Sequence, residues 1–307
     1  MSECLKQLRD NPKILANYLV KSELKHQSNQ YLTDLIISNQ QLIPIIFQSL
    51  YGNCILVQDE LFCLQLLKNL IELQFTSTNT NNGTLKLNDL FINNIDLRKL
   101  IRKTTCSFNI MFKYYMTLAN STQLFLTTCL REPITQLLSD EWYLDIDCDK
   151  ALGRFTNDEL QARFGPLNSK EYKLKTLKYR EKIVNQLHQY TLMFIESISS
   201  NLFCFPASLA WLVNQLYFHV NRTSQDASLA RKLCSDLVMA LFICPAICDP
   251  EPYGIIVDIQ VNSVARHNLM QIANILQVLA LSDDDKDLKA QDLYCKFRNV
   301  SFYIYTL

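Results

Sequence analysis

Glycine is scarce in this chain, with only five among 307 residues. Two-residue hairpin signals are nearly absent as well, so a fold built from β-hairpins would lack its turns. The longest uninterrupted apolar stretch, residues 237–248, contains a proline and is shorter than the roughly 18 residues that a membrane helix needs. These absences argue against a β-rich fold and against a membrane-spanning helix.

Net charge is also lacking, because 30 basic and 30 acidic residues balance. No overall field would draw the chain to nucleic acid or to an anionic membrane, so any function that depends on charge must be local. The 11 cysteines are scattered and show no C-x-x-C spacing, which predicts reduced, mostly buried thiols. The polar N-terminus does not resemble a signal peptide, and we expect a cytoplasmic protein.

Helical periodicity is the dominant pattern in what is present. Apolar residues recur every three or four positions in 59–75, 206–220 and 263–281, which predicts helices with one buried face. Further helices are predicted at 12–25, 31–50, 88–101, 106–118, 121–138, 171–200 and 225–243. Residues 147–171 are predicted to be a long connection with one short helix. The fold class is therefore predicted to be all-α, an irregular bundle of about ten helices.

The sequence lacks the common motifs of nucleotide-binding, metal and hydrolytic sites. No nucleotide-binding loop of the G-x-x-x-x-G-K-[ST] or G-x-G-x-x-G type occurs, and neither H-E-x-x-H nor G-x-S-x-G is present. The four histidines stand far apart and are interpreted as ordinary side chains. We therefore expect no nucleotide, metal or hydrolytic site in the chain itself.

Four cations lie close together in RKLIRK, between Arg98 and Lys103. Spacing alone favours a plain role, in which they stabilise the negative end of a helix by about 0.3–1 kcal/mol each. Thr104 and Thr105 would then interrupt the helix, and Thr105 or Ser107 can cap the next one. The pattern by itself leaves open whether any of these cations acts outside its own helix.

The segment IRKTTCSF, taken with its neighbours, resembles the finger loop of Ras GTPase-activating proteins, in which an apolar residue and an arginine precede a threonine-containing run and a helix. Four more segments resemble this family in the same order: LYGNCILVQDELFCLQLLKNLIEL, LFLTTCLREPITQLL, CFPASLAWLVNQLY, and FICPAICDPEPYGI followed by ARHNLMQIANILQVLA. Within the family the likeness is greatest to the endocytic Gapex branch, which joins a Ras GTPase-activating domain to a C-terminal Rab exchange domain.

The resemblance implies a Ras GTPase-activating domain over residues 1–285 and leaves the tail 286–307 uninterpreted. It implies that Arg102 is a catalytic finger, free of its helix and unpaired, which enters a Ras-family or Rab-family GTPase in the GTP state. The partner would supply GTP and Mg²⁺, so the chain would need no cofactor. The GTPase contacts that the resemblance implies are Lys103, Thr104, Thr105, Lys232, Arg266 and Asn268. Pro245 and Ala246 would have structural roles in the signature segment.

The resemblance also implies a place of action and leaves alternatives open. We expect a role in endocytic traffic with peripheral recruitment to endosomal or plasma membrane. Family members usually carry Phe-Leu-Arg before the I-C-P-A segment, and that arginine braces the finger loop; here Met239, Ala240 and Leu241 stand there. Asn274 stands where lysine is common. A GTPase-binding module with little catalysis, or a helical scaffold for unrelated partners, therefore remain alternatives.

Overall fold

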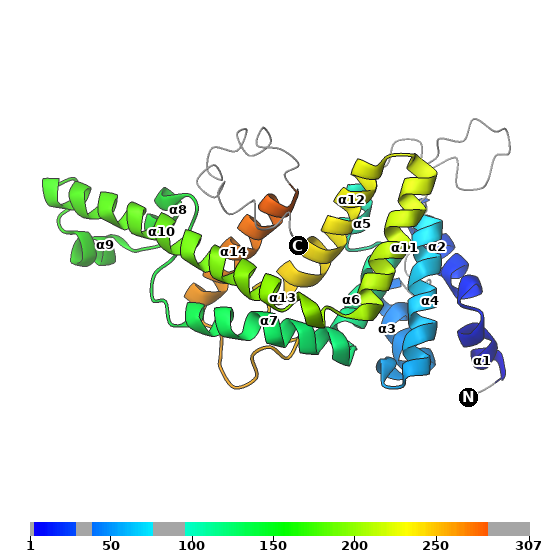
Figure 1. The fold of residues 1–307 in the computed structure, drawn as a ribbon. Helices are drawn as coiled ribbons and strands as arrows, with labels where there is room; N and C mark the ends of the chain where they lie inside the picture. Colours follow the sequence, from blue (N-terminus) through cyan, green and yellow to red (C-terminus); the bar gives the residue numbers. More distant parts are fainter. Residues whose placement is uncertain (1–2, 29–38, 76–95, 282–307) are drawn as a thin grey trace. The chain divides into compact units, whose positions relative to one another are not determined.

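A computed structural model describes residues 3–28, 39–75 and 96–281 of the chain (Figure 1). Within these ranges the chain forms helices and connecting segments without a strand, which confirms the predicted all-α class. Two compact units are present, one from residues 1–125 and 205–242 and the other from 126–204 and 243–307. We call them unit one and unit two and consider each by itself. The predicted domain end at 285 and the tail lie outside the described residues.

Unit one is built around helix α4. Its helices are α1 (Glu3–Asp10), α2 (Pro12–Ser28), α3 (Asn39–Tyr51), α4 (Val57–Gln74), α5 (Leu97–Arg102), α6 (Ser107–Leu118), α11 (Ala207–Ser224) and α12 (Ala227–Ser235). Helix α4 packs against α2, α6 and α11, and α12 packs against α11 and α5. In Figure 1, α2, α4 and α11 run side by side. Helix α4 also contacts α3, and a helix with this many neighbours must be apolar on more than one face.

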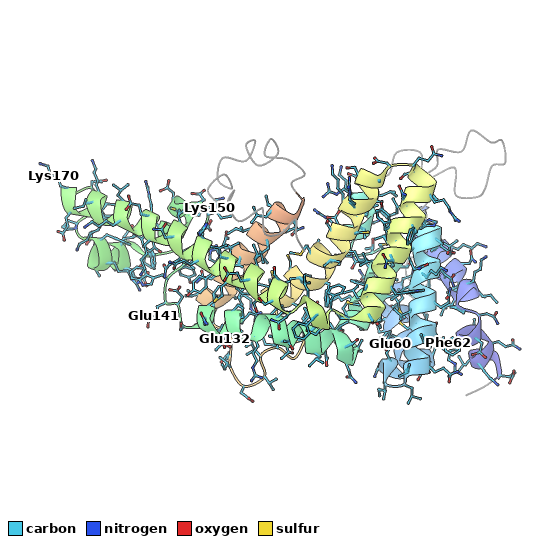
Figure 2. The ribbon with its side chains drawn as sticks, viewed as in Figure 1. Glu60, Phe62, Glu132, Glu141, Lys150 and Lys170 are labelled. Atoms are coloured by element: carbon cyan, nitrogen blue, oxygen red, sulfur yellow. The ribbon has the colours of Figure 1, made fainter. Side chains whose placement is uncertain are left out.

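The sequence of α4 meets this demand. Leu66 and Ile71 are wholly buried, and their positions lie roughly 140° apart around the helix. At its first turn Glu60, labelled in Figure 2, accepts a 2.6 Å hydrogen bond from the hydroxyl of Tyr115 on α6. Burial and this bond raise the pKa of the Tyr115 hydroxyl, which therefore stays protonated.

Unit two is organised around two long helices. It contains α7 (Asn120–Leu138) from residue 126 onward, α8 (Cys148–Leu152), α9 (Asn157–Phe164), α10 (Lys170–Ser200), α13 (Cys244–Cys248) and α14 (Ser263–Leu281). Helix α10 packs against α9 and α14, and α13 packs against α14. Figure 2 labels Lys170 at the first turn of α10. The short α13 contains Cys244, Pro245 and Ala246 of the I-C-P-A signature.

Most predicted helices are present at nearly the predicted bounds. The predicted helix 88–101 is an exception, because α5 begins at Leu97 after its N-cap Asp96. Residues 88–95 of that prediction and residues 31–38 of the predicted helix 31–50 lie outside the described residues.

Two other regions also differ from the predicted helices. Residues 147–171 hold two short helices rather than one, because Asp147 caps α8 and Thr156 forms a capping box with Glu159 at α9. The predicted helix 225–243 changes type at residue 236, where α12 gives way to a π-helical segment, η3 (Asp236–Ile243). The nine cysteines from Cys54 to Cys248 are free thiols, as predicted. In the same ranges, no helix combines the length and apolarity needed to cross a bilayer.

Candidate functional site

The candidate finger, Arg102, is the last residue of α5. Asp96 starts this helix by accepting a 3.0 Å hydrogen bond from the backbone N–H of Arg98. Leu97 and Ile101 are buried and hold α5 on the unit. Because Arg98 and Arg102 are four residues apart, their side chains share one side of the helix. The expectation that Arg102 lies free of its helix is therefore corrected: it occupies the last helical turn.

The guanidinium of Arg102 is paired with the carboxylate of Asp236, the first residue of η3. Nε of Arg102 donates to Oδ1 of Asp236 over 3.1 Å, and Nη2 donates to the same oxygen. Nε of Arg98 donates to the other oxygen, Oδ2, over 2.9 Å. The expectation of an unpaired finger is thus corrected too. One carboxylate faces two arginines.

Burial differs between the two sides of this ion pair. The Asp236 side chain is 0% exposed, while the side chains of Arg98 and Arg102 are 29% and 37% exposed. A buried carboxylate requires a cation or strong donors, whereas an arginine at the surface can exchange its partner for water. Asp236 is therefore the fixed member of the group, and Arg102 is its most exposed member.

The loop after Arg102 carries the three other implied contacts of this region. Lys103, Thr104 and Thr105 are exposed, and the loop closes with a 3.0 Å hydrogen bond from the backbone N–H of Cys106 to the carbonyl of Lys103. Burial raises the pKa of the Cys106 thiol to about 12, so this residue is an inert anchor. The loop presents a cation and two hydroxyls to solvent.

Helix α6 begins without a side-chain cap of its own, so the predicted capping by Thr105 or Ser107 is wrong. Cys106 is the N-cap and makes no side-chain capping bond. The free backbone N–H groups of Ser107 and Phe108 instead donate to Glu23 on α2 (3.1 Å) and Gln74 on α4 (3.0 Å). Two neighbouring helices thus satisfy donors that a local cap would otherwise satisfy.

Glu23 is the centre of this buried network. Its Oε2 accepts from the backbone N–H of Ser107, from the Ser107 hydroxyl at 2.9 Å, and from Nε2 of Gln74 at 2.8 Å. On the other side of the loop, Nδ2 of Asn109 donates to the carbonyl of Ile101 at 3.0 Å, which satisfies a terminal carbonyl of α5. Both ends of the loop that follows Arg102 are therefore anchored by side chains.

The segment that follows α12 contains position 241, where the family resemblance leads us to expect a bracing arginine. Leu241, which replaces the family's bracing arginine, and Asp236 both lie on η3. In this chain the acidic residue at the start of η3 contacts Arg102 directly. Lys232 lies in the last turn of α12, four residues before Asp236, and is partly buried. Lys232 thus belongs to the same unit as the loop of Lys103, Thr104 and Thr105.

Arg266, another implied contact, is engaged within unit two. Its Nη1 donates to the carbonyl of Cys248 (2.9 Å), to Asp249 (2.8 Å) and to Glu251 (3.0 Å). The hydrogen bond from Arg266 lowers the pKa of the Glu251 carboxyl, and the same bond raises the pKa of Arg266. This arginine therefore ties the end of the signature segment to α14.

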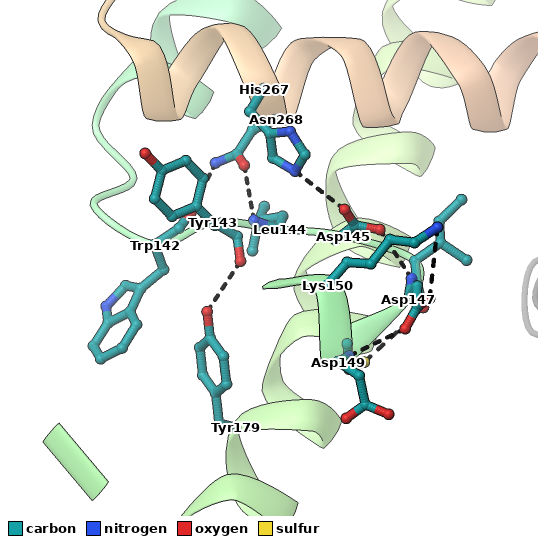
Figure 3. Close-up of polar contacts among 12 residues, drawn as sticks. Trp142, Tyr143, Leu144, Asp145, Asp147, Asp149, Lys150, Tyr179, His267 and Asn268 are labelled. Carbon is teal, nitrogen blue, oxygen red and sulfur yellow. Dashed lines mark hydrogen bonds and ion pairs between the residues drawn. The ribbon is translucent and has the colours of Figure 1, made fainter. Parts of the chain in front are cut away.

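Asn268 cannot contact a partner from its position in unit two, so that expectation is corrected. The residue is 0% exposed. Its Oδ1 accepts from the backbone N–H of Leu144 (2.8 Å) and its Nδ2 donates to the carbonyl of Trp142 (2.9 Å), as Figure 3 shows. Tyr179 donates to the carbonyl of Tyr143 (3.0 Å) between them. Asn268 thus holds the irregular segment between α7 and α8 through both of its polar atoms.

The signature residues Pro245 and Ala246 lie in α13. Pro245 occupies the first turn, where a missing N–H carries no cost, and Ala246 is wholly buried. Cys244 donates from its Sγ to the carbonyl of Ala273 on α14 over 3.4 Å. The small side chain of Ala246 fits the close packing of α13 on α14.

Sequence reasoning missed the residues that position the loop, namely Glu23, Gln74, Asn109 and Asp236. One of them had a signal: Asp236 is the only acidic residue within LCSDLVMALFICPAIC, and a lone carboxylate in an apolar run must find a cation or donors. The other three act across separate helices, and nothing in their local sequence reveals the contact.

Comparison with known proteins bears on the family of the chain. A family model described as GTPase-activator protein for Ras-like GTPase matches residues 66–281. The chain is 38% identical over 286 residues to the human GTPase-activating protein and VPS9 domain-containing protein 1, a match that covers 92% of this chain and 18% of that protein. The chain therefore belongs to the Ras GTPase-activating protein family.

Two further relatives carry endocytic names. The chain is 32% identical over 254 residues to the Receptor-mediated endocytosis protein 6 homolog of Drosophila pseudoobscura pseudoobscura, covering 81% of this chain and 13% of the relative. It is 27% identical over 252 residues to Receptor-mediated endocytosis protein 6 of Caenorhabditis elegans, covering 81% and 21%. The chain thus spans about a fifth or less of the length of these relatives.

Proposed function

We propose that the chain accelerates GTP hydrolysis on a Ras-like small GTPase by inserting Arg102 into the partner's active site. One observation carries this proposal: in a chain of the Ras GTPase-activating family, Arg102 is a partly exposed arginine at the end of α5, directly before an exposed Lys-Thr-Thr loop anchored at both ends. That placement provides a cation near a surface that a partner can cover.

The chemistry follows from where charge develops. During GTP hydrolysis, negative charge builds up on the phosphate oxygens, and a guanidinium supplied in trans stabilises it; such fingers raise the rate by about 10³ to 10⁵. A lysine in the same place would lack the planar set of donors that matches two oxygens at once. Nη1 of Arg102 has no hydrogen-bond partner among the described residues, so at least one edge of the group is available.

The test is single-turnover GTP hydrolysis by a panel of Ras-family and Rab-family GTPases, with and without this protein. We expect the wild type to accelerate one or more of them and Arg102→Ala to lose most of the acceleration. Arg131→Ala removes an exposed arginine from α7 and is the matched control. Equal acceleration by wild type and Arg102→Ala would refute the finger.

Two features of the chain favour a second candidate function, binding of a GTPase without catalysis. Leu241 replaces the bracing arginine, and Arg102 is held by Asp236 in the free protein; both features would weaken catalysis without weakening binding. The chain would then act as a module that tethers a GTP-loaded GTPase to endocytic membranes. Tighter binding to the GTP state than to the GDP state, without faster hydrolysis, would identify this function. Equal affinity for both states, or no binding, would exclude it.

A further inference from the structure

We propose that Asp236 is a positioning residue that holds Arg102 against the free protein and releases it to the partner's phosphates, while Arg98 keeps the carboxylate paired. This inference rests on the proposed role of Arg102 as the finger. In Figure 1, α5 lies beside α12, the helix that leads into Asp236, and the two helices pack together. The three side chains belong to one unit.

The nitrogen atoms that Arg102 uses in these hydrogen bonds indicate that the contact belongs to the free protein, before a partner binds. Nε is the guanidinium nitrogen nearest the backbone, and it donates to Oδ1 of Asp236, as does Nη2. When a guanidinium is bound through Nε, the arginine side chain lies against the surface of its own protein. To extend into a neighbouring active site, Arg102 must rotate away and break both bonds at once.

Arg98 makes that release feasible. A buried carboxylate left without any cation is strongly unfavourable. Arg98 bonds the other oxygen, Oδ2, over 2.9 Å, so Asp236 remains neutralised after Arg102 departs. Before release the group carries two positive charges and one negative charge; afterwards it is a balanced pair. Arg102 is therefore not needed to neutralise Asp236, and it can bind phosphate oxygens, which carry more negative charge.

The chemistry predicts opposite effects from two substitutions. Asp236→Asn removes the negative charge but keeps an amide of the same shape, so Arg102 is held less tightly. Arg98→Gln removes the competing cation but keeps a donor, so Asp236 holds Arg102 more tightly. Since hydrogen bonds to charged groups are roughly twice as strong as neutral ones, each effect should be about five- to tenfold.

The experiment measures kcat/KM for stimulated GTP hydrolysis on a GTPase that responds to the wild type. We expect Asp236→Asn to raise it and Arg98→Gln to lower it, and the double variant to return to the wild-type value or above. Lys99→Gln is the control, because it removes an exposed cation one residue from Arg98 without a bond to Asp236. Thermal unfolding of each variant reports whether the fold is intact.

The outcomes separate this inference from the proposed function. If Arg102→Ala abolishes stimulation but both Asp236→Asn and Arg98→Gln lower it equally, the holding role is overturned and the finger stands. If Arg102→Ala has no effect, the finger itself fails. Should Asp236→Asn prove unfolded, Arg98→Gln decides alone: stimulation equal to that of Lys99→Gln would overturn the proposal, and a five- to tenfold loss would support it.

Discussion

The hydrogen-bond network at the start of α6 predicts that replacing a single heavy atom of Glu23 lowers the stability of the protein. Glu23→Gln preserves the shape of the side chain but removes its charge. In the structure, one oxygen of Glu23 accepts three hydrogen bonds, two from Ser107 and one from Gln74. A glutamine has one acceptor oxygen to offer, and its amide nitrogen cannot accept.

The magnitude follows from the lost charge. A hydrogen bond contributes about 1 kcal/mol net, and a charged acceptor about twice that. The carboxylate also lies near the positive N-terminus of α6, which adds about 0.3–1 kcal/mol. Because three bonds share one oxygen they are not additive, and we expect a loss of about 1–2 kcal/mol. That corresponds to a fall in Tm of about 3–6 °C for a unit of this size.

The assay is thermal unfolding followed by circular dichroism, with Glu3→Gln as the matched control. Glu3 is an exposed carboxylate in the first turn of α1, so its change removes a similar helix-end interaction without burial. We also expect Glu23→Gln to lower GTPase stimulation, because the loop after Arg102 loses one anchor. Equal Tm values for the two variants would refute the reasoning that the buried network anchors the finger loop.

Two further predictions concern unit two. Asn268→Ala leaves the Leu144 N–H and the Trp142 carbonyl buried without partners. We expect the free energy of unfolding to fall by about 2–3 kcal/mol. Denaturant titration of the variant and the wild type measures this loss, and an unchanged midpoint would contradict it. The hydrogen bond from Arg266 lowers the pKa of the Glu251 carboxyl from its ordinary value. This pair therefore contributes stability above that ordinary pKa and loses it as the pH falls through the folded-state pKa. Arg266→Met should therefore flatten the acid-induced fall in Tm, and equal acid slopes would show that the pair has no such role.

The helices could be predicted because each carries its own periodic pattern. In α11 the buried residues Leu209, Leu212, Leu216 and Val220 repeat at helical spacing, and local burial alone explains them. The change to a π-helix at Asp236 could not be predicted in this way, since LCSDLVMALFIC reads as a continuous helix. Only one of the two short helices between 147 and 171 was predicted, because these helices depend on caps rather than on periodicity.

The candidate site was predictable only in part. The order of the segments identified the family and made Arg102 the candidate finger, since that information lies along the chain. The partner of Arg102 is 134 residues away in sequence, and no local pattern relates the two positions. The family resemblance implied contacts at Asn268 and Arg266, but the polar groups of these residues bind the backbone and carboxylates of their own unit. Polarity alone does not distinguish a surface contact from a buried one.

The most direct test of the account is the rate of single-turnover GTP hydrolysis on a responsive GTPase with saturating Arg102→Ala protein. The account predicts that the variant still folds, binds the GTP state, and loses about a thousandfold or more of the stimulated rate. A stimulated rate equal to that of the wild type, at the same occupancy, would contradict it and leave this helical domain without a finger.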